Sequence, residues 1–74
     1  MIKITLTIEG MMCPMCEAHV NKILKAELDG CEIKSNHKKN ITTVISQNDV
    51  SDEKIRESVL KTGYTLKAIK REIL

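Results

Sequence analysis

Cys13 and Cys16 stand three residues apart in segment 10–16, which reads GMMCPMC. A strand-like pattern precedes the segment and a helix-like pattern follows it, so Cys13 is expected in the connecting loop and Cys16 in the first helical turn. The free amides and partial positive charge of a helix N-terminus lower thiol pKa values and favour the thiolate. Thiolates prefer soft ions such as Cu(I) and Zn(II). The spacing therefore predicts a soft-metal site rather than two unrelated buried thiols.

The number of further ligands decides which metal this pair can hold. Closed structural zinc sites take four ligands, and Cys31 and His37 would supply the missing two. The predicted first helix has about 14 residues at about 1.5 Å each, so Cys31, which follows it, should lie about 20 Å from the pair. The same distance argues against His37, and Cys31 is interpreted as a small buried thiol. A two-sulfur site suits Cu(I), and its open side admits a thiolate from another protein, which favours transfer over storage.

The elements that position the pair follow from the apolar pattern. Alternation of apolar and polar residues predicts strands, and apolar residues spaced three to four positions apart predict helices. The expected elements are a strand over 2–9, a helix over about 14–28, hairpin strands over 31–36 and 41–46, a helix between Ser51 and Gly63, and a strand from Tyr64 to about Ile69. This order predicts an α+β, ferredoxin-like βαββαβ sandwich, with two helices on one face of a four-stranded antiparallel sheet. We expect one domain over residues 1–74.

The second helix carries its own start signals. Ser51 is expected to cap it, and Val50 and Ile55 have the spacing of a hydrophobic staple. Ile55, Val59 and Leu60 are expected to form its buried stripe.

The whole chain resembles the heavy-metal-associated domains, which include copper chaperones and the cytosolic metal-binding domains of copper-transporting P-type ATPases. Segment 10–16 matches their G-M-x-C-x-x-C signature, and segments 20–24 (VNKIL) and 62–64 (TGY) extend the match. The resemblance implies that the two signature cysteines hold Cu(I) in near-linear coordination. The chain departs from the family in a slightly short hairpin and in Cys31, where the family usually has a buried aliphatic residue.

The resemblance also assigns supporting residues. Met11 is expected to be buried as a hydrophobic tether under the loop, and Tyr64 to lie near the metal, as in bacterial chaperones. Zinc-exporting relatives often have an acidic residue before the first cysteine, where this chain has Met12, so copper is favoured over Zn(II) and other soft metals. Lys61 would offset the negative charge of a bis-thiolate centre. From spacing alone, His19 is expected on the same side of the helix as the second cysteine.

Composition and charge argue against several functions. The 12 basic and 10 acidic residues alternate along the chain and there is one aromatic ring, so nucleic acid binding is not expected. No apolar run approaches the roughly 20 residues of a membrane span, and the strand pattern begins at Ile2, which argues against a signal peptide. We expect a cytoplasmic location and a free chaperone rather than a transporter fragment. The expected partner is a copper-transporting P-type ATPase or another copper-handling protein. The chain is expected to be a monomer when metal-free, and metal binding between two facing loops could bridge a dimer.

The rival function is thiol-disulfide exchange. A Cys-Pro-x-Cys segment at a helix start is also the arrangement of glutaredoxins. That fold places a second, cis proline beside its disulfide, and Pro14 is the only proline here. A metal-binding protein that is not an enzyme is therefore preferred to a glutaredoxin-like oxidoreductase.

Overall fold

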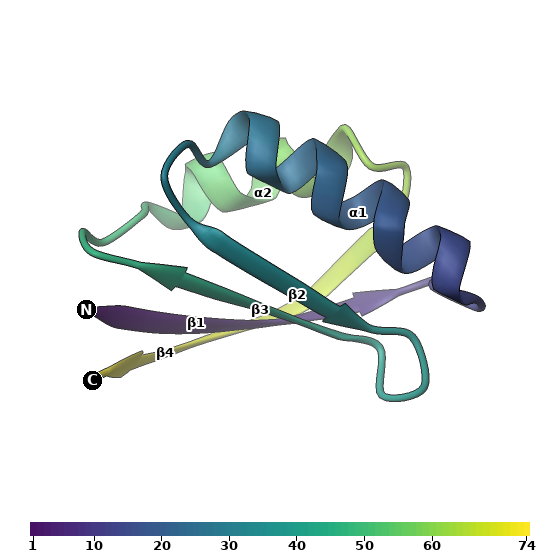
Figure 1. Cartoon of the computed structure of the whole chain (residues 1–74), viewed down its shortest axis with the longest axis horizontal. Coiled ribbons are helices and arrows are strands. Elements are labelled where there is room, and N and C mark those ends of the chain that lie inside the picture. The colour runs from purple at the N-terminus through teal and green to yellow at the C-terminus, as the bar shows by residue number, and fades with distance from the viewer.

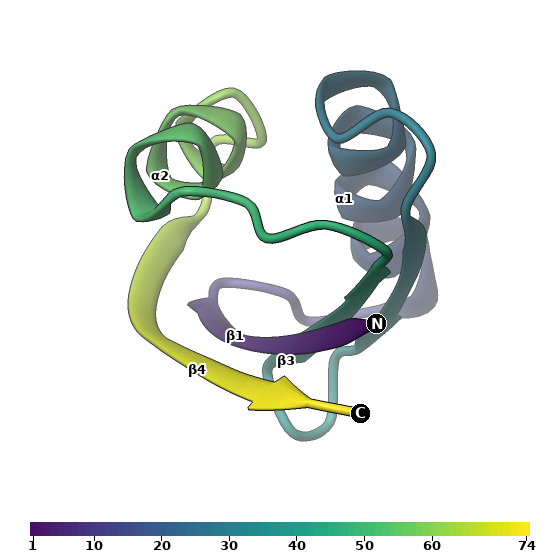
Figure 2. The ribbon, with the colours of Figure 1, turned by 90° about the vertical axis from the view of Figure 1, so that its left-hand side faces the viewer.

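The computed structural model describes residues 1–74 and contains four strands and two helices. In chain order they are β1 (Ile2–Glu9), α1 (Pro14–Glu27), β2 (Glu32–Asn36), β3 (Ile41–Ser46), α2 (Asp52–Leu60) and β4 (Thr65–Ile73). The strands form one layer, and both helices cover the same face of it (Figure 1, Figure 2). The predicted ferredoxin-like α+β sandwich is confirmed. Neither helix has the length and apolar character that crossing a bilayer requires.

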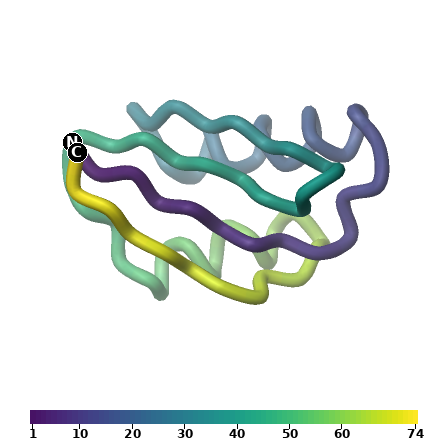
Figure 3. Tube along the Cα trace, turned by 90° about the horizontal axis from the view of Figure 1, so that it is seen from below, coloured from purple at the N-terminus to yellow at the C-terminus, as the bar shows by residue number.

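The sheet has the strand order β2-β3-β1-β4, and every neighbouring pair is antiparallel. Ile4 of β1 stands opposite Val44 of β3 on one side and Arg71 of β4 on the other. Figure 3 shows the strands side by side with the helices behind them. β4 continues to Ile73, past the predicted end near Ile69, because β1 offers backbone partners along its whole length.

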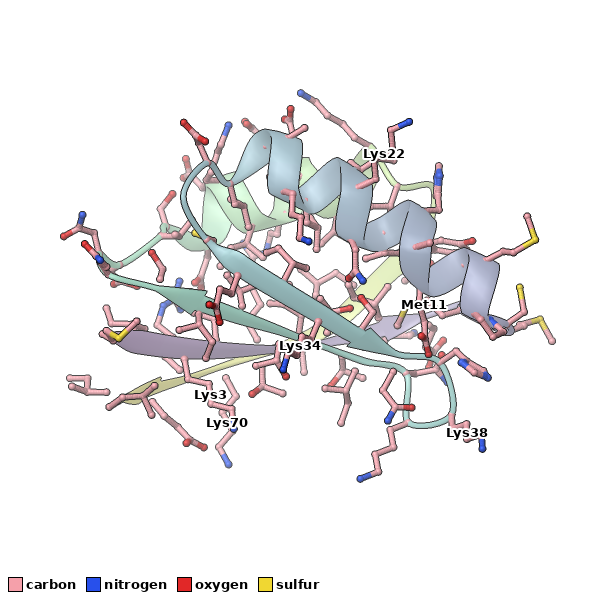
Figure 4. All side chains as sticks on the ribbon, viewed as in Figure 1. Lys3, Met11, Lys22, Lys34, Lys38 and Lys70 are labelled. Atoms are coloured by element: carbon pink, nitrogen blue, oxygen red, sulfur yellow. The ribbon has the colours of Figure 1, made fainter.

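The core lies between one face of the sheet and the inner sides of both helices. Its buried apolar side chains are Ile4, Leu6, Ile8, Met11, Val20, Leu24, Leu28, Ile33, Val44, Ile55 and Val59. In β1 and β3 every second side chain faces the helices, as the sequence alternation predicts. The opposite face of the sheet has no helix over it and carries Lys3, Lys34 and Lys70 (Figure 4).

Both helices begin where local chemistry predicts. Pro14 takes the first helical position of α1, where its missing N–H costs no hydrogen bond. At the start of α2, the Ser51 hydroxyl accepts a hydrogen bond from the Lys54 N–H at 3.2 Å. Val50 packs against the core, as the predicted staple requires.

The predicted buried stripe of α2 is correct for Ile55 and Val59 and wrong for Leu60. The Leu60 side chain is 75% exposed. At about 100° per residue, Leu60 lies about 140° around the helix axis from Ile55, outside the buried side. Ser58 occupies that side instead, and its hydroxyl donates to the Lys54 carbonyl at 2.7 Å, so the buried polar group is paired.

Three turns meet at one end of the sheet: the β1–α1 loop, the β2–β3 turn and the α2–β4 turn (Figure 1, Figure 3). The Ile8 N–H at the end of β1 donates to the Asn40 carbonyl of the β2–β3 turn at 2.8 Å. Segment 10–16 is therefore flanked by two turns that are distant from it in sequence.

Candidate metal centre

Cys13 and Cys16 form a close pair at the start of α1. Their Sγ atoms are 3.2 Å apart, and both thiols are free and partly exposed. Cys13 has an extended backbone (φ −157°, ψ 166°) and is the N-cap residue of α1. Cys16 lies in the first helical turn and donates its N–H to the Cys13 carbonyl at 3.0 Å. The expected placement of one thiol in the loop and one in the helix is confirmed.

Hydrogen bonds at this site lower the pKa of Cys16 from its ordinary value of 9.0 to about 7. The largest cause is the Tyr64 hydroxyl, followed by a backbone hydrogen bond from Met12 and the side chain of Cys13. The same contact raises the pKa of Tyr64, because a phenol that donates to a thiolate is held in its protonated form. A substantial fraction of Cys16 is therefore thiolate near neutral pH, which is the form that binds metal.

Tyr64 contacts three parts of the site. Its hydroxyl is the largest cause of the low pKa of Cys16. Its ring packs on the backbone of Gly10, where an added Cβ would stand 2.7 Å from Tyr64 Cδ1. The His19 ring meets the tyrosine ring edge-on, with centroids 6.2 Å apart and an interplanar angle of 85°. The structure thus places Tyr64 against the loop that leads to the cysteine pair.

The three methionines of segment 10–16 differ in burial. Met11 is 2% exposed and lies between α1 and the sheet (Figure 4), where a tether under the loop is expected. Met12 and Met15 are 84% and 82% exposed, so their thioethers lie at the surface. Met12 acts on the site through its backbone, whose hydrogen bond contributes to the low pKa of Cys16.

Lys61 lies on the turn that borders the site, but its charge is paired elsewhere. Its Nζ donates to Glu27 Oε1 at 2.5 Å, at the C-terminal end of α1. This hydrogen bond raises the pKa of Lys61 and lowers that of Glu27. The structure therefore places the charge of Lys61 with Glu27 rather than with the cysteine pair.

His37 lies beside the start of α1, contrary to the distance predicted from the sequence. Its backbone N–H and its Nδ1 lie 2.6 Å and 2.5 Å from Glu17 Oε2. The distance prediction is wrong because the five residues of β2, at about 3.3 Å each, return the chain along α1 toward the cysteines. His37 still does not complete a zinc site, since no three His, Cys, Asp or Glu side chains are grouped as ligands.

Cys31 precedes β2 at the opposite end of α1. It is partly buried and packs against the core, and its Sγ lies 4.0 Å from the Asp29 carbonyl. Cys31 therefore packs against the core, as predicted, but its side chain is only partly buried rather than fully buried.

Two contacts of the site were not foreseen by sequence reasoning. Gly10 provides the surface on which Tyr64 packs, and no local pattern reveals a contact between residues so far apart in the chain. Glu17 anchors the β2–β3 turn through His37. An acidic residue in a first helical turn is usually explained by the helix dipole, which hides this second contact.

Comparison with known proteins was made on sequence and on structure. No family model and no curated protein matches the sequence. The copper binding domain from HMA7, a P-type ATPase, shares 28% identity with a TM-score of 0.71, over 100% of this chain and 95% of that one. The yeast copper transporter domain Ccc2a, alone and in the Atx1-Cu(I)-Ccc2a complex, shares 25% identity with a TM-score of 0.75, over 90% of this chain and 93% of that one. The CopZ metallochaperone matches in fold, with 22% identity and a TM-score of 0.73 over 88% of this chain and 98% of that one.

The resemblance seen in the sequence therefore extends to three dimensions. The order of the elements agrees with the predicted fold. The positions of the cysteine pair at the start of α1 and of the buried methionine beneath it agree with the signature. In fold the chain is therefore similar to copper-binding domains, among them one from a copper transporter and one from a P-type ATPase, at 25% and 28% sequence identity.

Proposed function

We propose that the chain binds Cu(I) through the thiolates of Cys13 and Cys16 and passes the ion to another copper-handling protein. The observation that carries this proposal is the pair of free sulfur atoms, 3.2 Å apart at a partly exposed helix N-terminus. Cys16 supplies a thiolate near neutral pH, since its pKa is about 7. Two soft donors with no further grouped ligand fit Cu(I) better than Zn(II), which takes four ligands in closed sites.

Binding and transfer proceed by ligand exchange, and copper stays in its +1 state throughout. When Cu(I) binds, the two thiols release their remaining protons to water, so the loaded site consists of one monovalent cation and two thiolates. A thiolate of the partner then bonds to copper, and one Cu–S bond to this chain breaks. The released sulfur takes a proton from water. A second partner thiolate then bonds to copper, the remaining Cu–S bond to this chain breaks, and that sulfur is protonated in turn.

The structural neighbours support a partner of this kind. One of them is a complex of two proteins with Cu(I), and another is a domain of a P-type ATPase. We infer that the partner is a copper-transporting P-type ATPase or another copper-handling protein. The free thiols suit a reducing compartment such as the cytoplasm. The chain moves an ion and makes no covalent change in a substrate, so we infer that it is not an enzyme.

Anaerobic titration of the reduced protein with Cu(I), read by mass spectrometry of the intact chain, tests the proposal. One Cu(I) per chain is expected, retained when Zn(II) competes. The variant carrying Cys13→Ser and Cys16→Ser should bind none. Cys31→Ser is the matched control, because it removes the remaining thiol from the opposite end of α1 and should leave binding intact.

Two results would contradict the proposal. One is equal Cu(I) retention after both loop sulfurs are removed. The other is preferential retention of Zn(II), Cd(II) or Hg(II), which would assign the site to another soft metal. Dithiol-disulfide turnover with glutathione at rates typical of a redox enzyme would instead support the oxidoreductase alternative.

A further inference from the structure

His19 connects α1 to the turn that carries Tyr64. Its Nε2 lies 3.2 Å from the carbonyl oxygen of Thr62. Its ring stands edge-on to the Tyr64 ring, with centroids 6.2 Å apart. The sequence spacing predicts only that His19 lies on the same side of α1 as Cys16. In the structure its ring contacts the α2–β4 turn, through Thr62 and Tyr64.

Thr62 is firmly held between α2 and Tyr64. It is 5% exposed, and its hydroxyl donates to the Val59 carbonyl at 2.6 Å. The same hydroxyl oxygen accepts the N–H of Tyr64 at 3.2 Å. A contact made to the Thr62 carbonyl therefore acts on the backbone that sets the position of the tyrosine.

We propose that His19 is a positioning residue: by donating Nε2–H to the Thr62 carbonyl and packing against the Tyr64 ring, it holds the tyrosine ring against Gly10, beside the loop that carries Cys16. A carbonyl oxygen can only accept, so Nε2 must carry the proton. The proposal deepens the proposed function and rests on it only in that Cys16 is a ligand. The positioning itself is a property of the metal-free protein and is tested there.

The first test uses the unaltered protein. Long-range ¹H–¹⁵N correlation of the imidazole nitrogens, at a pH where His19 is neutral, reports which nitrogen carries the proton. The Nε2–H tautomer is expected. The Nδ1–H tautomer would overturn the proposal, because an unprotonated Nε2 cannot donate to Thr62. This measurement is independent of whether any variant folds.

The second test compares three variants by the signal of the tyrosine. Tyr64 is the only Tyr, and the chain has no Trp or Phe, so its near-ultraviolet circular dichroism reports this ring alone. His19→Ala should lose most of the signal, and His19→Gln, whose amide can donate to the same carbonyl, should recover most of it. Lys22→Ala is the matched control, since Lys22 projects from the side of α1 that faces away from the sheet (Figure 4).

The third readout is the reactivity of Cys16, measured as its alkylation rate at neutral pH in a background with Cys13→Ser and Cys31→Ser. His19→Ala should slow alkylation about fivefold, the change expected when one ordinary hydrogen bond is lost. His19→Gln should restore the rate and Lys22→Ala should leave it unchanged. Equal rates and equal tyrosine signals in His19→Ala and the parent would overturn the proposal. A protein that shows these effects but ignores Cu(I) would refute the proposed function and leave the positioning role standing.

Discussion

The ring of Tyr64 lies so close to Gly10 that a methyl group at position 10 would stand 2.7 Å from Tyr64 Cδ1. Gly10 also has a φ of +107°, a backbone conformation that other residues rarely adopt. The hydroxyl of the same tyrosine is the largest cause of the low pKa of Cys16. The glycine before the signature methionine therefore has two roles: it turns the chain after β1, and it leaves room for the ring of the tyrosine whose hydroxyl lowers the pKa of Cys16.

Gly10→Ala should destabilise the protein and displace Tyr64. The substitution combines a strained backbone with a contact that forces the ring to move, and a cost of about 2–4 kcal/mol in the free energy of unfolding is expected. Urea denaturation measures the cost. Near-ultraviolet circular dichroism of the tyrosine should fall in parallel.

Gly30→Ala separates the two causes. Gly30 has a φ of +79° and nothing within 4 Å of its added Cβ, so alanine there meets backbone strain alone. Its cost should be about 1 kcal/mol, and the tyrosine signal should stay unchanged. Equal costs and equal signals for the two alanine variants would show that the ring does not rest on Gly10.

Tyr64→Phe should raise the pKa of Cys16 from about 7 toward its ordinary value, by about one unit. The phenylalanine ring keeps the packing on Gly10 and removes only the hydroxyl, which is the largest cause of the low value. Alkylation of Cys16 as a function of pH, with the other two cysteines replaced by serine, measures the shift. An unchanged midpoint would show that the hydroxyl does not act on the sulfur.

The same variant should alter how stability depends on pH. The folded protein holds the pKa of Cys16 below that of the unfolded chain, so the stabilisation is fully present above about pH 9 and is lost as the pH falls through about 7. The deprotonation of Cys16 should therefore make the free energy of unfolding in reducing buffer rise between pH 7 and pH 9. Tyr64→Phe should flatten that rise. An identical slope in the variant and the parent would contradict this prediction.

The local patterns of the chain were sufficient to predict most of the fold. Alternation in 2–9 fixed which face of β1 is buried, and Ser51 marked the start of α2 correctly. The position of the cysteine pair followed from the strand before it and from the helix start at Pro14, which lies between the two cysteines. These features depend on chemistry within one turn or one strand, which is why sequence alone can reveal them.

Contacts between distant segments could not be predicted in the same way. The length of β4 depends on the partners that β1 offers, so its continuation to Ile73 is invisible in its own charged sequence. The approach of His37 to Glu17 depends on the direction and length of β2 relative to α1. The contact of Tyr64 with Gly10 depends on the α2–β4 turn lying beside the end of β1, which neither segment shows by itself.

Met11→Ala should cost about 2–5 kcal/mol of unfolding free energy, because the side chain is 2% exposed and its removal leaves a cavity beneath the loop. Met12→Ala is the matched control, since the neighbouring side chain is 84% exposed and its loss should change stability by no more than about 0.5 kcal/mol. Urea denaturation of both variants without metal gives the comparison. Similar stabilities would contradict the assignment of Met11 to the core.

Glu17→Gln should release the β2–β3 turn from α1 at neutral pH. The backbone N–H and the side chain of His37 both contact the Glu17 carboxylate, and these bonds lower its pKa below the ordinary range. A lowered carboxylate pKa gives stability that is present above the pKa of the unfolded chain and lost as pH falls through that of the folded protein. The variant should therefore be less stable than the parent at pH 7, and the difference should shrink as acid protonates Glu17 in the parent.

Urea denaturation at pH 7 and at successively lower pH measures that difference. Glu9→Gln is the control, because Glu9 is an exposed carboxylate whose nearest partner, Lys67, is 3.8 Å away. Exposed pairs of this kind contribute little, so Glu9→Gln should change stability less than Glu17→Gln and without the same dependence on acid. A Glu17→Gln deficit that persists undiminished at low pH would mean that packing of the side chain, rather than its charge, holds the turn beside the cysteines.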